Sequence, residues 1–262
     1  MKIIGHVCLV DARMWTWACG LASTLCLSAC AMLGPGSPRA QVEPQVPQRL
    51  PLVFQAADKA GWEPLLLPGK LRTTFSQTRH DGRHSLEARA QGSASMLRQR
   101  VRIEPSQLGR LTFHWQVAQL IDGADMRVVE REDSPARVVL AFDGDRRQFS
   151  PRNAMLSELT RSLTGEDMPY AMLMYVWSND LPVETVIVNP RTDRIRKIVV
   201  ESGPSRLRQW LHYERDVRAD FERAFGEPVG MLQGVAIMTD SDNTRGFAQA
   251  WYGTIRLDPA PR

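Results

Sequence analysis

The stretch MLRQRVRI, residues 96–103, consists of two alternating sets of side chains. The two interleaved sets are Leu97, Gln99, Val101 and Ile103 on one side and Arg98, Arg100 and Arg102 on the other. Successive side chains of a β-strand point to opposite faces of a sheet, whereas an α-helix repeats about every 3.6 residues. The stretch therefore predicts a strand with one face in a core. Its arginine row is interpreted as a solvated face with cross-strand acids such as Glu87, and contact with acidic glycans or lipid phosphates is the alternative.

Short apolar runs bounded by turn residues recur on both sides of this stretch. The further expected strands cover residues 71–78, 84–90, 111–117, 136–142, 170–177, 184–188, 195–200, 229–239 and 247–257. Asp81-Gly82, between the first two of these runs, is typical of a hairpin turn. Phe113 and Trp115 share one parity in 111–117, which favours a core position for Trp115. The pattern predicts an all-β protein, a two-sheet jelly-roll-like β-sandwich of about ten strands with one or two short helices.

Two segments have helical rather than strand spacing. In the first segment the apolar positions are Met155, Leu156, Leu159 and Leu163, with Asn153 as the expected N-cap and Gly165 as the stop. In the second, between residues 206 and 225, they are Trp210, Val217, Phe221, Ala224 and Phe225, and Gly226 and Pro228 end the pattern. Both segments predict short helices that pack on the sandwich.

Length and charge limit the classes of protein. The chain has 262 residues, enough for one core or for one core and a small satellite. It carries 33 Lys and Arg against 29 Asp and Glu, a formal net charge of +4. Such a small excess does not indicate a nucleic-acid-binding protein.

The N-terminal thirty residues are typical of an export signal. Residues 14–29 form a long apolar stretch without charge, and it ends in Leu27-Ser-Ala-Cys30. This ending resembles a bacterial lipobox, in which the cysteine thiol carries the lipid; an ordinary signal peptide with a chance cysteine is the alternative. Ala31 replaces the aspartate of an inner-membrane retention signal, which favours an outer-membrane anchor facing the periplasm. Whether translation starts at Met1 or Met14 stays open.

The expected signal peptide determines which cysteines the exported protein keeps. The cysteines are Cys8, Cys19, Cys26 and Cys30, so cleavage would leave Cys30 alone, and the exported domain could form no internal disulfide. Residues 31–51 contain five prolines, a composition typical of an extended tether. We expect a signal peptide at 1–29, a lipidated cysteine and tether at 30–51, and the sandwich domain at 52–258.

Several motifs resemble those of the bacterial domain-of-unknown-function family 3047. They are Gly92-Ser-Ala-Ser95, Leu111-Thr-Phe-His-Trp115, Asp133-Ser-Pro-Ala-Arg137-Val-Val-Leu-Ala-Phe142, Tyr175-Val-Trp177, Glu214-Arg-Asp-Val217, Phe225-Gly226 and Ile237-Met-Thr-Asp-Ser-Asp-Asn-Thr244. They run in order over about residues 52–257. The resemblance implies kinship with jelly-roll sandwiches of the carbohydrate-binding type, and it implies no particular activity.

The most polar constellation follows an apolar strand. Asp240, Asp242 and Asn243 lie in the run Asp-Ser-Asp-Asn-Thr, which is typical of a turn between strands. Ligand contact and calcium binding are the alternatives, because oxygen ligands at this spacing suit calcium. The run lacks the glycine and distal glutamate of an EF-hand loop. We therefore predict no metal and no cofactor.

Arg137 stands among apolar residues of an expected central strand. Burial of an isolated charge is costly, so we expect an ion pair with one of Asp133, Asp216, Asp240 or Asp242; a ligand-facing arginine is the alternative. Trp177 lies near a strand end, where it either packs in the core or offers a platform for a sugar ring. The candidate ligand-binding residues are Asp133, Arg137, Trp177, Asp240, Asp242 and Asn243.

No catalytic signature is present. The histidines His80, His84, His114 and His212 form neither an HExxH nor an HxH pattern, and nucleophile-elbow and phosphate-loop motifs are absent. We therefore favour a non-catalytic module of the outer membrane that binds a glycan or another envelope component. The alternatives are a glycan hydrolase using acids of the Asp240–Asn243 loop and a structural or assembly protein. The expected partners are the membrane, through lipid on Cys30, and an envelope glycan or protein, but no nucleic acid.

Overall fold

The computed structural model describes residues 50–55 and 61–260. The chain divides into two units, residues 1–43 and 44–262, and all described residues belong to the second. The expected signal peptide, Cys30 and most of the expected tether lie outside the described residues. Among the residues described, no helix has the length and apolar character needed to cross a membrane.

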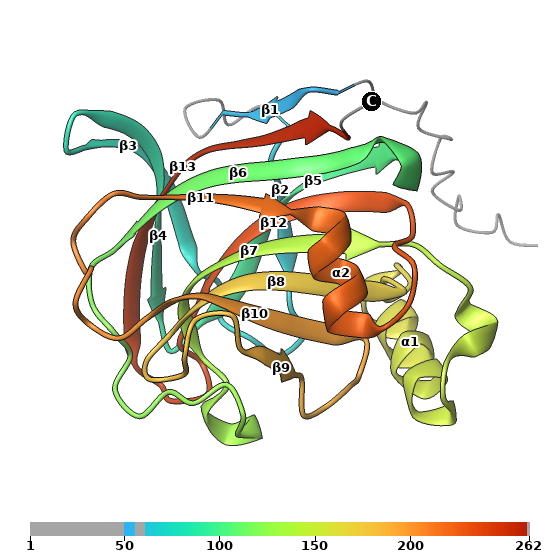
Figure 1. Cartoon of the computed structure of the whole chain (residues 1–262). Helices are drawn as coiled ribbons and strands as arrows, with labels where there is room; N and C mark the ends of the chain where they lie inside the picture. Colours follow the sequence, from blue (N-terminus) through green and yellow to red (C-terminus); the bar gives the residue numbers. More distant parts are fainter. Residues whose placement is uncertain (1–49, 56–60, 261–262) are drawn as a thin grey trace, which may run out of the picture. The chain divides into compact units, whose positions relative to one another are not determined.

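Strands dominate the described residues (Figure 1). The strands are β1 (Leu52–Phe54), β2 (Glu63–Leu66), β3 (Thr74–His80), β4 (Arg83–Gln91), β5 (Ala94–Ile103), β6 (Leu108–Val117), β7 (Ser134–Phe142), β8 (Ala171–Ser178), β9 (Val186–Val188), β10 (Ile195–Ser202), β11 (Leu211–Asp216), β12 (Leu232–Asp240) and β13 (Phe247–Pro259). The α-helices are α1 (Pro151–Thr164) and α2 (Val217–Phe225).

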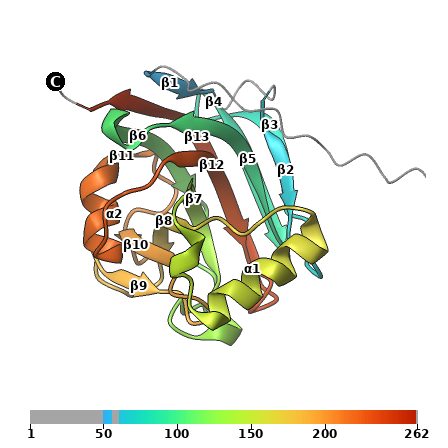
Figure 2. The same cartoon turned by 90° about the vertical axis from the view of Figure 1, so that its right-hand side faces the viewer.

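The strands form two sheets, which confirms the predicted all-β, two-sheet sandwich (Figure 2). The six-stranded sheet has the order β11-β6-β13-β4-β3, with β1 paired to β13. The seven-stranded sheet has the order β2-β5-β12-β7-β8-β10-β9. Within it β8 and β10 run parallel. Helix α2 contacts β6, β10 and β11, so it closes one edge between the two sheets.

All ten expected strands are present, and the structure adds β1, β2 and β11. The continuous helix expected between residues 206 and 225 is wrong in its first half. Leu211–Asp216 is strand β11, paired antiparallel with β6, and Asp216 accepts the backbone N–H of Ala219 to cap α2. Tertiary pairing outweighs the apolar spacing here. The stop at Gly226 is confirmed, since this residue is left-handed with φ 70°.

Helix α1 lies where it was expected, but its apolar side chains face solvent instead of the protein. Ser150, rather than the expected Asn153, caps it by accepting the backbone N–H of Asn153. The side chains that face the protein are polar, Asn153 and Ser157. Asn153 donates to Asp193 and accepts from Thr192, so hydrogen bonds rather than apolar packing hold the helix. The expected apolar face lies outside, with Met155 64%, Leu159 53% and Leu163 59% exposed.

The main core lies between the sheets and is rich in aromatic side chains. Trp115 is fully buried, as its parity predicted, and its ring centroid lies 5.1 Å from that of Phe113. Phe113 in turn stacks on Tyr175 of the opposite sheet at 5.7 Å. Burying a large apolar side chain of this kind contributes about 1.5–3 kcal/mol. These contacts pack the two sheets against each other.

A second apolar cluster covers the other face of the seven-stranded sheet. It includes Met96, Met174 and Met238 from the strands and Met126 from the segment before β7. Strands buried on both faces read as continuous apolar runs, which explains the composition of β8 and β12. The seven-stranded sheet is therefore largely covered on both faces, whereas β3, β4 and β11 of the six-stranded sheet carry exposed residues.

Candidate functional site

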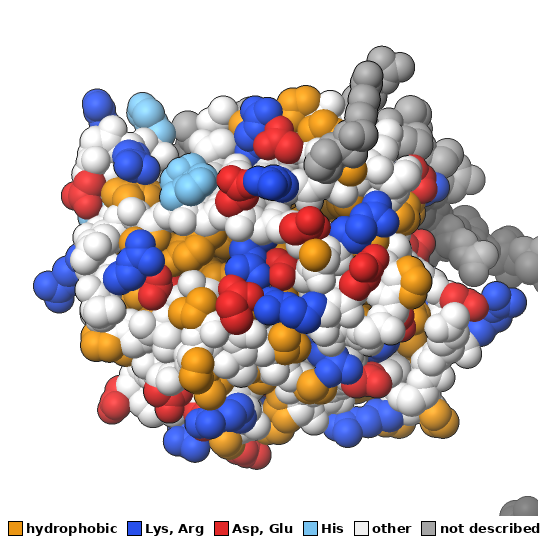
Figure 3. All heavy atoms as spheres, in the orientation of Figure 1, with side chains coloured by type: hydrophobic (Ala, Val, Ile, Leu, Met, Phe, Trp, Pro, Cys, Tyr) orange, Lys and Arg blue, Asp and Glu red, His pale blue; other side chains and the backbone are white. Residues whose placement is uncertain are grey.

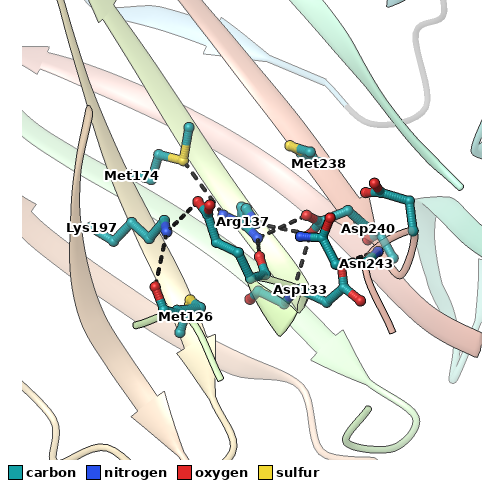
Figure 4. Close-up of polar contacts among 12 residues, drawn as sticks. Met126, Asp133, Arg137, Met174, Lys197, Met238, Asp240 and Asn243 are labelled. Atoms are coloured by element: carbon teal, nitrogen blue, oxygen red, sulfur yellow. Dashed lines mark hydrogen bonds and ion pairs between the residues drawn. The ribbon is translucent and has the colours of Figure 1, made fainter. Parts of the chain in front are cut away.

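Four strand and loop segments bring most of the predicted site residues together (Figure 4). Arg137 on β7 is bidentate to Asp240 at the end of β12, with Nε to Oδ1 at 2.9 Å and Nη2 to Oδ2 at 2.8 Å. Arg137 Nη2 also donates to the carbonyl oxygen of Glu132 at 2.6 Å. Arg137 is 2% exposed and Asp240 4%. The expected buried ion pair is confirmed, and Asp240 is its partner.

A second buried cation continues this network. Lys197 on β10 has no exposed surface, and its Nζ donates to Glu132 Oε1 at 2.5 Å. Burial, together with the charge of Arg137, lowers the pKa of Lys197 to about 8. Arg191 and Asn189 also donate to the Glu132 carboxylate. Each buried charge therefore has an opposite charge in contact, as a low-dielectric interior requires.

The acidic loop folds back on the same network. Asp133 accepts the backbone N–H groups of Asn243 at 3.1 Å and Thr244 at 2.7 Å, and also the Thr244 hydroxyl. Asp242 forms an ion pair with Lys70. Carboxylate oxygens of Asp133, Asp240 and Asp242 lie within 4.8 Å of one another. Because N–H groups and cations already engage all three, this geometry fits a loop closure, and the prediction of no metal stays a prediction.

The side chain of Trp177 is buried in the core. Its side chain has no exposed area, and its indole N–H donates to the carbonyl oxygen of Gly203 at 3.1 Å. The core alternative is therefore the one observed, and a sugar ring cannot reach this indole. The candidate set divides accordingly. Asp133, Arg137, Asp240, Asp242 and Asn243 form one polar cluster, and Trp177 belongs to the core.

Two of the three arginines in the β5 row, Arg98 and Arg100, pair with acids. Arg98 is bidentate to Glu166 at 2.7 and 3.0 Å, and Arg100 pairs with both Glu63 and Glu166. The solvated-face interpretation holds, but with different acids. Glu87 lies on β4 of the other sheet, where it accepts from Arg89.

A hollow of about 300 Å³ opens on the outer face of the six-stranded sheet. Its lining residues are Gln55, Arg83, His84, His114, Trp210, Gly253 and Thr254. His114 stands between Phe113 and Trp115 on β6, and those two point into the core, so alternation directs His114 to the outer face. The register of β13 shifts between Tyr252 and Ile255, which places Gly253 and Thr254 in a bulge beside His114. Bulges are frequent at binding sites because they redirect side chains.

A glycine lies at the floor of this hollow. A Cβ atom on Gly253 would lie 3.1 Å from the His114 side chain and 3.5 Å from the Trp210 ring. The missing side chain therefore lets Trp210 lie close to the sheet. A Cβ atom at this position would press on the His114 side chain, which would have to shift slightly, and would make an ordinary contact with the indole.

Two histidines meet across strands at this place. His114 and His212 are directly paired in the β6–β11 register, and His212 Nδ1 lies 2.9 Å from His114 Nε2. His114 Nδ1 faces the Thr254 carbonyl oxygen at 3.4 Å. A carbonyl only accepts, so Nδ1 carries the proton and Nε2 accepts from His212. Burial lowers the pKa of His114, the Thr254 contact opposes this, and the nearby charges of His212 and Arg83 lower it further.

Aromatic stacking connects the hollow to the β3–β4 hairpin. His80 stacks on Trp251 with centroids 3.8 Å apart and planes at 2°, and its ring lies 6.5 Å from Trp210. The guanidinium of Arg83 lies over the Trp210 ring at 5.5 Å. In Figure 3 histidine surface appears on the side where β3 and β11 lie in Figure 1. The four histidines without a sequence motif thus gather on one sheet face. Sequence reasoning missed this site, because strand pairing alone brings the residues together.

The described residues therefore define a two-sheet β-sandwich with a hollow on one sheet face. The chain belongs to the family described as protein of unknown function (DUF3047), which matches residues 60–256. Among curated proteins no match is found.

Two solved structures that resemble the fold are carbohydrate-binding modules. The family 11 module of the cellulosomal cellulase Lic26A-Cel5E of Clostridium thermocellum has a TM-score of 0.40 and 8% identity, with 80% of this chain and 95% of that chain covered. The low-affinity xylan-binding module of family 86 from Roseburia intestinalis has a TM-score of 0.31 and 14% identity, with 80% and 96% covered.

Proposed function

We propose that the sandwich domain binds a glycan, without acting on it chemically, in the hollow on the outer face of the six-stranded sheet. The observation that carries this proposal is the lining of the hollow. It combines an indole (Trp210) with the amide of Gln55, the guanidinium of Arg83 and two imidazoles. Planar polar groups suit the neighbouring hydroxyls of a sugar. The part of the half-buried indole that Arg83 and Gly253 leave uncovered offers apolar surface to the C–H groups of the sugar. A volume of about 300 Å³ is at the small end of ligand sites.

The acidic loop gives less support to the hydrolase alternative. A glycosidase needs two carboxyl groups that reach the scissile bond. Asp240 is 4% exposed and held by Arg137, and Asp242 pairs with Lys70. Neither carboxyl group is free to exchange a proton with a bound sugar in this arrangement.

Glycan binding is tested with the full chain, purified in mild detergent, on an array of envelope and plant-type polysaccharides. We expect at least one glycan to be retained by the native protein. Trp210→Ala should weaken retention about tenfold or more, equivalent to roughly 1.4 kcal/mol, since it removes one wall of the hollow. His84→Ala, which truncates an exposed side chain, should weaken it without affecting folding.

Phe149→Ala is the matched control. Phe149 stacks on Tyr170 at 5.6 Å and does not line the hollow, so its truncation should leave glycan retention unchanged. Retention that survives both Trp210→Ala and His84→Ala would contradict the assignment of the hollow. Absence of retention for every glycan would contradict the function itself.

We further propose that the domain is held at the outer membrane, facing the periplasm, by lipid on Cys30. The lipobox-like Leu27-Ser-Ala-Cys30 after an apolar stretch supports this proposal. Cells fed radioactive palmitate should label the native protein, and Cys30→Ser should abolish both the label and cleavage after Ala29. The control is Cys26→Ser, which should leave labelling intact. Labelling of the Cys30→Ser variant would overturn the proposed anchor.

A further inference from the structure

Among the described residues that line the hollow, every titratable side chain is basic. The titratable side chains among its lining residues are Arg83, His84 and His114, and no carboxylate is among them. His212, which contacts His114, adds a further basic group. The acids on adjoining strands have other partners. Asp81 contacts His80, Glu214 pairs with Arg110, and Glu87 accepts from Arg89 and Gln249. The hollow is therefore suited to an anion rather than to a cation or a neutral group.

Arg83 has the geometry of an anion-binding arginine. Its guanidinium lies over the Trp210 ring, and within the described residues no hydrogen bond or ion pair engages its N–H groups. Stacking on an aromatic ring fixes the plane of a guanidinium while its edge donors stay free. By contrast, the guanidinium of Arg137 already donates hydrogen bonds to Asp240 and Glu132. Arg83 thus offers the fork of donors that binds a carboxylate or phosphate bidentately.

The histidine pair adds to this preference. His114 already shares one hydrogen bond with His212 and lies in the field of Arg83. Two imidazoles that share one proton at 2.9 Å carry at most one positive charge between them, because one ring must accept the hydrogen bond. A bound carboxylate or phosphate would favour this singly charged state, whereas a neutral sugar would not.

We propose that the hollow selects acidic glycans, with Arg83 binding the carboxylate of a uronic acid or the phosphate of a sugar phosphate beside His84 and His114. This inference rests on the glycan-binding function proposed above. It adds the chemical class of the ligand and the residue that recognises its charge.

The test compares three probes by isothermal titration with the full chain in mild detergent at pH 6 and low salt. The probes are tetragalacturonate, its carboxyl-reduced neutral counterpart of the same length, and mannose 6-phosphate. We expect at least one acidic probe to bind tenfold or more tightly than the neutral one, and this difference should shrink as salt is added. The two acidic probes separate a carboxylate source from a phosphate source.

Two arginine variants locate the charge recognition. Arg83→Gln should remove the preference for the acidic probe and reduce the ratio to about twofold or less. Arg102→Gln, which makes the same change in net charge on β5 of the other sheet, should keep the preference. A neutral probe that binds as tightly as both acidic probes would overturn the inference and leave glycan binding intact. Preference retained in Arg83→Gln would overturn it too. No binding of any probe, together with an empty glycan array, would overturn both proposals.

Discussion

Arg137 shows how one buried charge organises the polar cluster beside the seven-stranded sheet. It is joined to Asp240 by two hydrogen bonds and to the backbone of Glu132 by a third. Asp133 binds the loop that follows β12, so the ends of β7 and β12 are connected twice. An ion pair in such a position gives little net stability compared with an apolar pair, but removal of one partner is costly.

Arg137→Met is therefore expected to destabilise the protein by about 3–5 kcal/mol, because Asp240 would stay buried without its partner. The double variant Arg137→Met, Asp240→Leu should recover a large part of this loss. Urea unfolding followed by tryptophan fluorescence measures both free energies. A single variant as stable as the native protein would show that the pair has no structural role.

Sequence reasoning reached this pair because its signal is local. An arginine among apolar strand residues must find a carboxylate, and only a few acids were near enough in the expected topology. The same reasoning could not settle Trp177, since a strand-end tryptophan has the same neighbours in sequence whether its ring points inward or outward. The hydrogen bond from its indole to Gly203 depends on a loop that the pattern did not describe.

At the scale of elements, strand alternation was a sound guide and helical spacing was a poorer one. Every expected strand is present. One-sided burial imposes a period of two on strands such as β6, and burial on both faces gives β8 and β12 continuous apolar runs. The apolar residues of α1 have helical spacing, yet polar contacts of Asn153 fix the helix with that face outward. β11 was hidden because its partner β6 lies about a hundred residues earlier, and pairing at that distance leaves no local pattern.

The connection after α1 gives a pH-dependent prediction. Glu166 is bidentate to Arg98, whose hydrogen bonds lower the pKa of Glu166 to about 2, with Arg100 adding to the effect and burial opposing it. The folded-state pKa lies below the ordinary value of 4.5, so the stabilisation is present above about pH 4.5 and is lost as the pH falls towards 2. Glu166→Gln should therefore lower Tm at pH 6 and have little effect at pH 2.5.

Glu158→Gln is the control for this experiment. Glu158 pairs with Arg161 on the exposed side of α1, where screening by water leaves a weak interaction. The Tm of the Glu158→Gln variant should differ little from that of the native protein at both pH values. A Glu166→Gln difference that is equally large at pH 6 and pH 2.5 would contradict the assigned pKa shift.

At the scale of the whole molecule, the two sheets have different roles. The seven-stranded sheet is covered on both faces, by the main core on one side and by the methionine-rich cluster on the other. The six-stranded sheet shares the main core and carries the hollow, with the histidines and two tryptophans, on its outer face. Most of the candidate residues expected from sequence belong to the covered seven-stranded sheet and its loops. The residues that suit a ligand lie on the outer face of the six-stranded sheet.

The reason is physical. Polar residues that follow one another in a loop are conspicuous in sequence, but here they serve to close a loop. The hollow is built from β4, β6, β13 and the segments beside β1 and β11, and each contributes one or two residues. No spacing rule connects His84 with His114 and Trp210, because their distances in sequence are set by strand lengths and crossovers.

The central claim is that a glycan binds in this hollow, and NMR mapping tests it most directly. The imidazole and indole signals of the full chain in detergent micelles are recorded while a glycan retained on the array is added. We predict saturable shifts of the His84, His114 and Trp210 signals, with the Trp177 indole unchanged. Saturable shifts confined to the Asp240–Asn243 loop, with the hollow signals unchanged, would contradict the account.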